Sequence, residues 1–413
     1  MMKRIALILM AVALVTPAFA QVQNITVGGD LAVTGLYRNN FGIGTLADVS
    51  SNWLMSQIKV WLKAQVTDDI SVVASIINEK DWGTEVLKTP PLANEITLNE
   101  AYVSLKNLMI PGMSLTAGRQ EFVIADGLVA SSQIYRPALY PVLLGAPDLG
   151  WQKAVEALKV GYENETVAVN VIKSKLYDNP FAAWIPIPLK DVDMYVADVA
   201  FNLGMFKLEP YATLVKANLG IDLWTYALLV KVSPIEGLAI SGEYAMQNGD
   251  LGDIATVDFE GKAFNLGVDY AFAGGMKPRV SVGYALFSGQ DAGADISAWI
   301  PVAPAGTADR LGKIATAVVG PLGEGVLSGG VKAFRAGVGV NPTEKMGVDL
   351  KLFYLLSDEA TTDDIGTEAD LGLKYDLAKD VSVGLDLGYL WTGDFFGAAD
   401  NAWQAIASLK VSF

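Results

Sequence analysis

Charged side chains recur at every second position in several segments of the chain. Asp349 and Lys351, for example, alternate with Val348, Leu350 and Leu352. A face that carries charges of both signs binds water, forms ion pairs and attracts small ions. Catalysis that depends on histidine or cysteine is excluded, because the sequence contains neither residue. Cys-based zinc sites, thiol redox chemistry and Ser-His or Cys-His nucleophiles therefore cannot form.

The same phase of alternation identifies a set of charged residues that we expect on one face. The basic candidates are Lys59, Lys63, Arg119, Arg279, Arg335, Lys351, Lys374 and Lys410, and the acidic candidates are Glu100, Glu121, Glu243, Asp269, Asp349, Asp376 and Asp386. For any one of these residues the simpler interpretation is a charge that is only solvated or paired. As a group they predict a hydrated interior of mixed charge.

A period of two is typical of β-strands, whose successive side chains point to opposite faces. The last segment, 403–413, places Trp403, Ala405, Ala407, Leu409, Val411 and Phe413 on one face. Ten tilted residues give an apolar band of roughly 25 Å, which fits the strand of an outer-membrane barrel. Charges must then face the interior, since each costs about 2–4 kcal/mol on the lipid side at mid-membrane.

Eighteen such segments occur between residue 24 and the end of the chain, among them 112–123 and 151–162. Their connectors sort by parity into a mostly long set and a short set, as an even-stranded barrel requires. We therefore predict an all-β fold, a transmembrane antiparallel barrel of about eighteen strands with both termini periplasmic. The long extracellular connectors would include residues 124–150 and 289–329.

These two connectors are unusually apolar for loops. The first contains Pro137, Pro141 and Pro147, and residues 308–319 of the second have the composition of a short helix. Connectors of this length are usually functional or mobile. Either they fold into the barrel and narrow it, or they form an extracellular lid or contact surface.

The first twenty residues have the pattern of a secretory signal. Lys3 and Arg4 precede an apolar run at 5–15, and Ala-Phe-Ala at 18–20 is a cleavage site. The run is shorter than the ~20 residues of a membrane helix. We expect Sec export and a mature protein, residues 21–413, that forms a single barrel. The whole chain has a formal net charge of −15, which makes nucleic acid an unsuitable partner.

Two stretches resemble the alginate-export family of outer-membrane porins. Residues 98–105 read Leu-Asn-Glu-Ala-Tyr-Val-Ser-Leu, and residues 115–121 read Leu-Thr-Ala-Gly-Arg-Gln-Glu, followed by Ala-Asp-Gly-Leu at 125–128. The resemblance implies an 18-stranded porin, with Glu100, Tyr102, Arg119, Gln120 and Glu121 as lumen or constriction residues. Leu128 stands where the family motif has arginine, and few arginines occupy lumen positions. The family's fold is thus expected to transfer better than its substrate.

The sequence favours a passive outer-membrane channel for small hydrophilic or charged solutes, narrowed by inward-folding loops. We expect no enzymatic step, no cofactor and no metal. The partners would be outer-membrane lipid, lipopolysaccharide and small solutes or ions, with a homo-oligomer as a further option. Two alternatives stay open, namely a structural or surface-array barrel and a dedicated exporter of an acidic polysaccharide.

Overall fold

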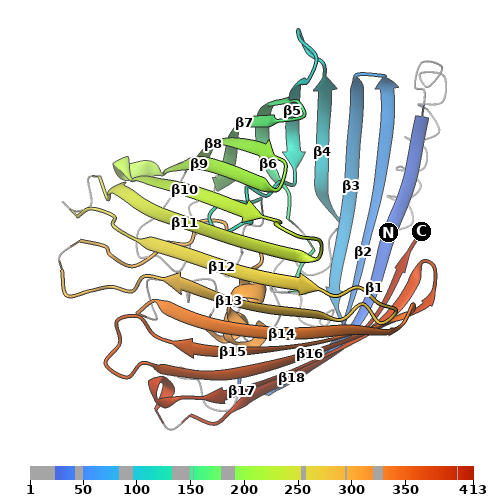
Figure 1. Cartoon of the computed structure of the whole chain (residues 1–413). Helices are drawn as coiled ribbons and strands as arrows, with labels where there is room; N and C mark the ends of the chain where they lie inside the picture. The colour runs from blue at the N-terminus through green and yellow to red at the C-terminus, as the bar shows by residue number, and fades with distance from the viewer. Residues whose placement is uncertain are drawn as a thin grey trace.

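The protein is a closed antiparallel β-barrel. The computed structural model describes residues 24–41, 50–82, 96–132, 149–151, 153–177, 191–252, 257–293, 295–319, 329–397 and 399–413. Within them, eighteen strands form one sheet, in which each strand pairs with its neighbours in sequence. β1 pairs with both β2 and β18, which closes the barrel (Figure 1). The predicted fold class and strand number are confirmed.

The strands are mostly 9–17 residues long. They are β1 (Asn24–Asn39), β2 (Ser51–Thr67), β3 (Ile70–Asp81), β4 (Thr97–Lys106), β5 (Met113–Gln120), β6 (Val155–Glu163), β7 (Val167–Tyr177), β8 (Val192–Leu203), β9 (Phe206–Lys216), β10 (Asp222–Val232), β11 (Leu238–Asp250), β12 (Lys262–Ala271), β13 (Arg279–Phe287), β14 (Val331–Thr343), β15 (Met346–Leu356), β16 (Asp364–Ala378), β17 (Val381–Thr392) and β18 (Ala402–Ser412). The helices are α2 (Thr307–Leu311) and α3 (Lys313–Val319), with the single 3-10 turns η5 (Asn218–Gly220) and η7 (Asp394–Phe396). No helix in the described part of the chain is long and apolar enough to cross a membrane.

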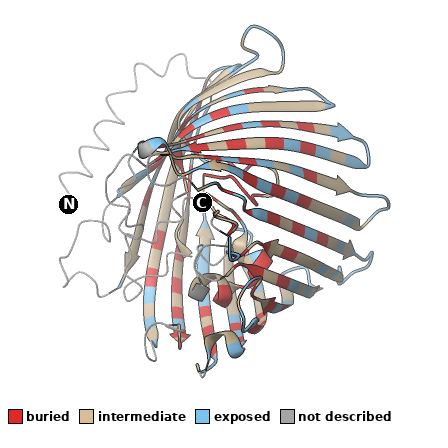
Figure 2. Ribbon diagram, turned by 90° about the vertical axis from the view of Figure 1, so that its left-hand side faces the viewer, coloured by how far each residue is buried: buried red, intermediate tan, exposed pale blue. Residues whose placement is uncertain are grey.

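The two faces of the wall differ in composition because side chains alternate along each strand. Tyr284 of β13 lies opposite Phe334 of β14, with ring centroids 4.9 Å apart on the outer face. The next residues along, Ala285 and Ala333, also lie opposite each other, but they face inward and are fully buried. Figure 2 shows this alternation of burial along the strands. The outer face is therefore apolar and rich in aromatic side chains.

The wall between β5 and β6 is shorter than the sequence predicts. β5 ends at Gln120 instead of 123, and β6 begins at Val155 instead of 151. The chain leaves the wall at Glu121 because Phe122 and Ile124 become buried inside the barrel, at 8% and 4% exposure. The backbone there bonds locally instead of along the wall: the N–H of Ile124 donates to the carbonyl of Ala130, and that of Ser132 to the carbonyl of Phe122.

The predicted helix at 308–319 is present as two short helices, α2 and α3, which are separated at Gly312. This glycine has φ of 94°, a conformation that L-residues rarely adopt. A Cβ atom on Gly312 would also lie 2.6 Å from the carboxylate of Glu368. The break lets the backbone approach β16 closely. The predicted signal at 1–20 and the connector residues 133–148 and 320–328 lie outside the described residues.

Candidate functional site

Two segments of the long connectors lie inside the barrel and touch each other. We call residues 121–132 lumen segment A and residues 295–319 lumen segment B. The backbone N–H of Ala305 donates a 2.7 Å hydrogen bond to the carbonyl of Gly127. The hydroxyl of Ser131 donates a 2.8 Å hydrogen bond to the carbonyl of Ala303. The described parts of both connectors thus fold inward and narrow the barrel.

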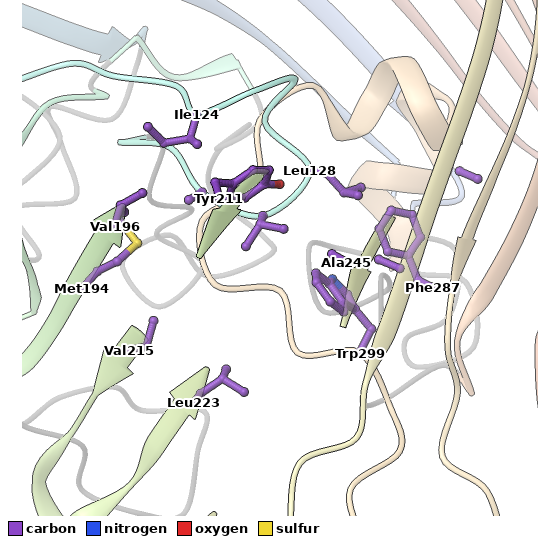
Figure 3. Packing of buried hydrophobic residues seen from close by; sticks show 14 of the residues in the cluster. Ile124, Leu128, Met194, Val196, Tyr211, Val215, Leu223, Ala245, Phe287 and Trp299 are labelled. Atoms are coloured by element: carbon purple, nitrogen blue, oxygen red, sulfur yellow. The ribbon is translucent and has the colours of Figure 1, made fainter. Parts of the chain in front are cut away.

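Apolar side chains attach both segments to the inner wall. In segment B, Trp299 is 1% exposed, and its ring centroid lies 6.4 Å from that of Phe287 in β13. In segment A, Ile124 and Leu128 are buried in the same cluster as Tyr211 of β9. Figure 3 shows Trp299 beside Phe287, and Ile124 and Leu128 near Tyr211. Burying each large apolar side chain contributes about 1.5–3 kcal/mol, which holds the segments in place.

A clamp of carboxylates fixes the start of α3 on the wall. Glu368 of β16 is fully buried, and its two oxygens accept backbone N–H bonds from Ile314 and Ala315, at 2.7 and 2.8 Å. The backbone N–H of Lys313 donates to the neighbouring Asp370 at 3.1 Å. The first N–H groups of a helix lack partners within the helix, and negative charge is favoured there. The clamp therefore orients segment B.

A polar cavity of about 280 Å³ lies between the lumen segments and strands β12–β15. Its lining combines Asp126 of segment A, Gly306, Asp309 and Arg310 of segment B, and Asn265, Gly267, Asp269, Ser281, Val282, Arg335, Ala336, Lys351 and Phe353 of the wall. Three of the predicted residues, Asp269, Arg335 and Lys351, meet here. Because the cavity brings charges from both lumen segments and from the wall around one open space, we take it as the candidate site.

The basic side chains of the cavity differ in how they are engaged. Lys351 pairs with Asp309 at 2.6 Å. Arg335 donates one bond from Nη2 to the carbonyl of Leu266 at 2.9 Å, while its Nη1 is buried without a hydrogen-bond partner among the described residues. The charge of Arg310, which is 4% exposed, acts on Arg335 from segment B. Arg335 thus has unfilled donor capacity beside the positive charge of Arg310, an arrangement that suits an anionic group.

An acidic wall lies on β9 and β11. The hydroxyl of Tyr211 donates a 2.5 Å hydrogen bond to Glu243, and both side chains are buried. Glu209, on the same face of β9 as Tyr211, is 5% exposed, and its charge acts on Glu243. The charge of Arg310, in segment B, also acts on Glu243. The charge of Arg310 thus acts both on an acidic group, Glu243, and on a basic group, Arg335.

A second cluster of predicted residues lies on β2–β5, apart from the cavity. Lys59 pairs with Glu100 at 3.2 Å and with Glu121 at 3.3 Å. Ser75 donates to Glu100 at 2.9 Å, and Tyr102 lies two residues further along the same face of β4. The structure therefore places these residues inside the barrel, with their charges largely paired.

The other predicted residues on the inner face are also mostly paired. Arg279 bonds to Asp349 through Nε at 2.9 Å, Lys374 pairs with Asp376 at 3.0 Å, Asp386 pairs with Lys313 of α3, and the Nζ of Lys63 lies 5.0 Å from the ring centroid of Trp61. The predicted Lys410 is on the inner face of β18, where it lies opposite Ser382 of β17. These residues are spread along the wall instead of gathering at one site.

Arg119 does not line the lumen, contrary to the sequence prediction. It lies opposite Ala101 in the register of β4 and β5, on the outer face. Its guanidinium pairs there with Glu156 at 2.6 Å and donates to the carbonyl of Leu98. Gln120 does face inward, but it is 4% exposed and its amide donates to the carbonyl of Ala157 at 3.0 Å. Its observed role is to hold the wall together.

Sequence reasoning missed four charged residues of the lumen segments, namely Asp126, Asp309, Arg310 and Lys313. Alternation assigns a face only within a strand, so it gives no direction for a residue in a connector. The available signal was the apolar composition of the connectors, which made an inward position one of two options. It did not indicate which charges they carry into the lumen.

Comparisons with known proteins establish the fold. No protein-family model and no curated protein sequence matches the chain. The structure is similar to that of OccK8 (OprE) of Pseudomonas aeruginosa, at 9% identity and a TM-score of 0.62, over 95% of this chain and 99% of that one. It is also similar to OccK2 (OpdF) of the same organism in complex with glucuronate, at 9% identity and a TM-score of 0.61, and to OpdK with vanillate, at 11% and 0.60. Each of these covers 94% of this chain and 98% of the other.

The fold is therefore that of the 18-stranded outer-membrane porins. The comparisons support this broader kind of barrel and give no support to the alginate-export family.

Proposed function

We propose that the protein is an outer-membrane channel for the passive diffusion of small charged solutes. The observation that carries the proposal is the cavity between Arg335, Arg310 and Lys351, enclosed in a closed barrel with an apolar outer face. An apolar exterior suits lipid, and a hydrated interior of mixed charge suits ions. The mature barrel would comprise residues 21–413, exported through the Sec pathway after removal of residues 1–20.

The lumen segments give the channel its selectivity. An eighteen-stranded barrel with strands ~4.8 Å apart and tilted by ~40° has a backbone diameter of about 36 Å, far wider than a small solute. Segments A and B occupy part of this width, and a cavity of about 280 Å³ lies between them and strands β12–β15. A solute must then pass beside the charged side chains instead of moving through open water.

The free donor capacity of Arg335 favours an anionic solute. Its Nη1 has no hydrogen-bond partner in the described structure, and Arg310 adds a second positive charge nearby. Glucuronate and vanillate, bound by two of the structural neighbours, each carry a carboxylate. We infer that a small organic anion is the preferred solute, with its carboxylate beside Arg335. No bond is made or broken in this process.

In the membrane, the long connectors would face outward and both termini would lie in the periplasm. Lipopolysaccharide would surround the end of the barrel that carries the long connectors. Association of several barrels through their apolar outer faces is compatible with this arrangement, and native mass spectrometry in detergent tests it.

Planar-bilayer recording of the purified full-length protein tests the channel. Stepwise conductance in KCl, reduced by added glucuronate but not by glucose, is the expected result. Conductance no greater than that of protein-free bilayers would contradict the proposal. In that case ordered lattices in electron micrographs of intact envelopes would favour a structural barrel.

Export of an acidic polysaccharide has less support. Such a polymer needs a continuous passage dense in arginine, whereas segments A and B leave a compact cavity, and Arg119 lies on the outer face. Block of the conductance by long oligouronates at lower concentration than by glucuronate would favour this alternative.

A further inference from the structure

One acidic side chain of segment B forms an ion pair with a basic side chain of the cavity. Asp309, in α2, contacts the Nζ of Lys351 through Oδ1 at 2.6 Å. Both side chains are accessible, at 76% exposure for Asp309 and 42% for Lys351. The pair therefore lies at the open boundary of the cavity, where a solute can reach it.

The other charges of the cavity are arranged differently. Asp126 pairs with Lys231 of β10, at 2.5 Å. Asp269 lines the cavity and acts on Arg335 at longer range, with no ion pair to Lys351. Asp309 is thus the acidic side chain of the lining that forms an ion pair with a basic side chain of the same lining. Its charge also acts on Arg335.

We propose that Asp309 is an internal competitor of the solute. Its carboxylate binds Lys351 while the cavity is empty, and an anionic solute displaces it to reach Lys351 as well as Arg335. Asp309 would thereby set the specificity of the site, because only an anion that binds better than this tethered carboxylate is retained. The inference rests on the proposed channel function and assigns a residue that controls it.

Displacement requires little energy and little movement. An exposed ion pair changes an equilibrium constant by a factor of about five or less, so a solute carboxylate can replace one partner. Glycines with positive φ flank α2, at Gly306 (71°) and Gly312 (94°). The Asp309 side chain can turn away while α3 stays clamped to Glu368.

The test compares four single substitutions and two double variants in planar bilayers, with glucuronate as the probe. Asp309→Asn frees Lys351, and we expect glucuronate affinity and the anion-to-cation permeability ratio to rise about two- to fivefold. In the Lys351→Gln background the same change should have little effect, since the competed group is gone. Asp269→Asn removes the same charge from the same cavity, and its effect should persist in that background. Asp363→Asn, in an exposed connector, is the surface control.

A double-mutant cycle separates competition from a general effect of charge. Equal effects of Asp309→Asn with and without Lys351 would overturn the inference, because Asp309 would then act only through its field. No effect of Asp309→Asn in a conducting, glucuronate-sensitive channel would also overturn it, and the channel function would stand. A wild-type protein that does not conduct contradicts the channel function itself, and the inference falls with it.

Discussion

The side chain of Glu368, on the inner face of β16, accepts a 2.7 Å hydrogen bond from the backbone N–H of Ile314. The contact joins a strand of the barrel wall to the first turn of a helix inside the lumen. Because Glu368 is fully buried, water cannot replace it as the acceptor. This bond therefore ties the position of segment B, and with it Arg310, to the wall.

Replacing Glu368 should loosen segment B. Glu368→Ala leaves the backbone N–H groups of Ile314 and Ala315 without an acceptor, at a cost of about 1–3 kcal/mol for each buried group. We expect a larger and noisier single-channel conductance, with the strands still formed. Bilayer recordings and circular dichroism measure the two properties. Unchanged conductance and noise in the folded variant would show that the clamp does not hold the constriction.

The guanidinium of Arg335 lies directly over Gly283 of β13. A Cβ atom at Gly283 would lie 2.5 Å from Cζ of Arg335, so Gly283→Ala must push the flexible guanidinium aside. We expect about tenfold weaker block by glucuronate, the loss of one hydrogen bond to a charged group. Gly339→Ala is the matched control, since it displaces Arg279 in the same way outside the cavity. Equal effects of both variants would contradict a special role for Arg335.

Two arginines that the sequence assigns to the lumen, Arg335 and Arg119, should behave differently. Arg335→Ser removes a charge from the cavity and should lower the anion-to-cation permeability ratio about twofold, the effect of one charge at ~8 Å in water. Arg119→Ser changes the outer face and should leave the ratio unchanged. Reversal potentials in a KCl gradient report both values. A shift for Arg119→Ser as large as that for Arg335→Ser would place Arg119 at the pore.

The preference for anions should decrease with ionic strength. Between 0.1 and 1 M salt the screening length falls from ~10 Å to ~3 Å, which is shorter than the width of a solute. We expect glucuronate affinity to fall across this range in the wild type, and to fall less in Arg335→Ser. Current block measured at several KCl concentrations gives both slopes. Affinity that does not change with salt would indicate recognition through uncharged contacts.

The sequence by itself determined the barrel. Period-two alternation identified eighteen strands and the inner face of residues such as Lys351 and Asp386, since a charge in lipid is costly whatever the rest of the molecule does. The parity of the connectors separated short turns from long loops, because successive connectors of an antiparallel barrel lie at alternate ends. Arg119 was placed on the inner face with the other charges, although it shares its phase with Leu115 and Ala117.

Only the tertiary structure decided the site. Asp126, Asp309 and Arg310 lie in connectors, where no period relates a residue to a face. Their positions depend on contacts between residues far apart in the sequence, such as Ala305 with Gly127 and Ile314 with Glu368. Strand alternation is a local property that each segment carries alone. A cavity between two loops and a wall exists only when all of them are packed together.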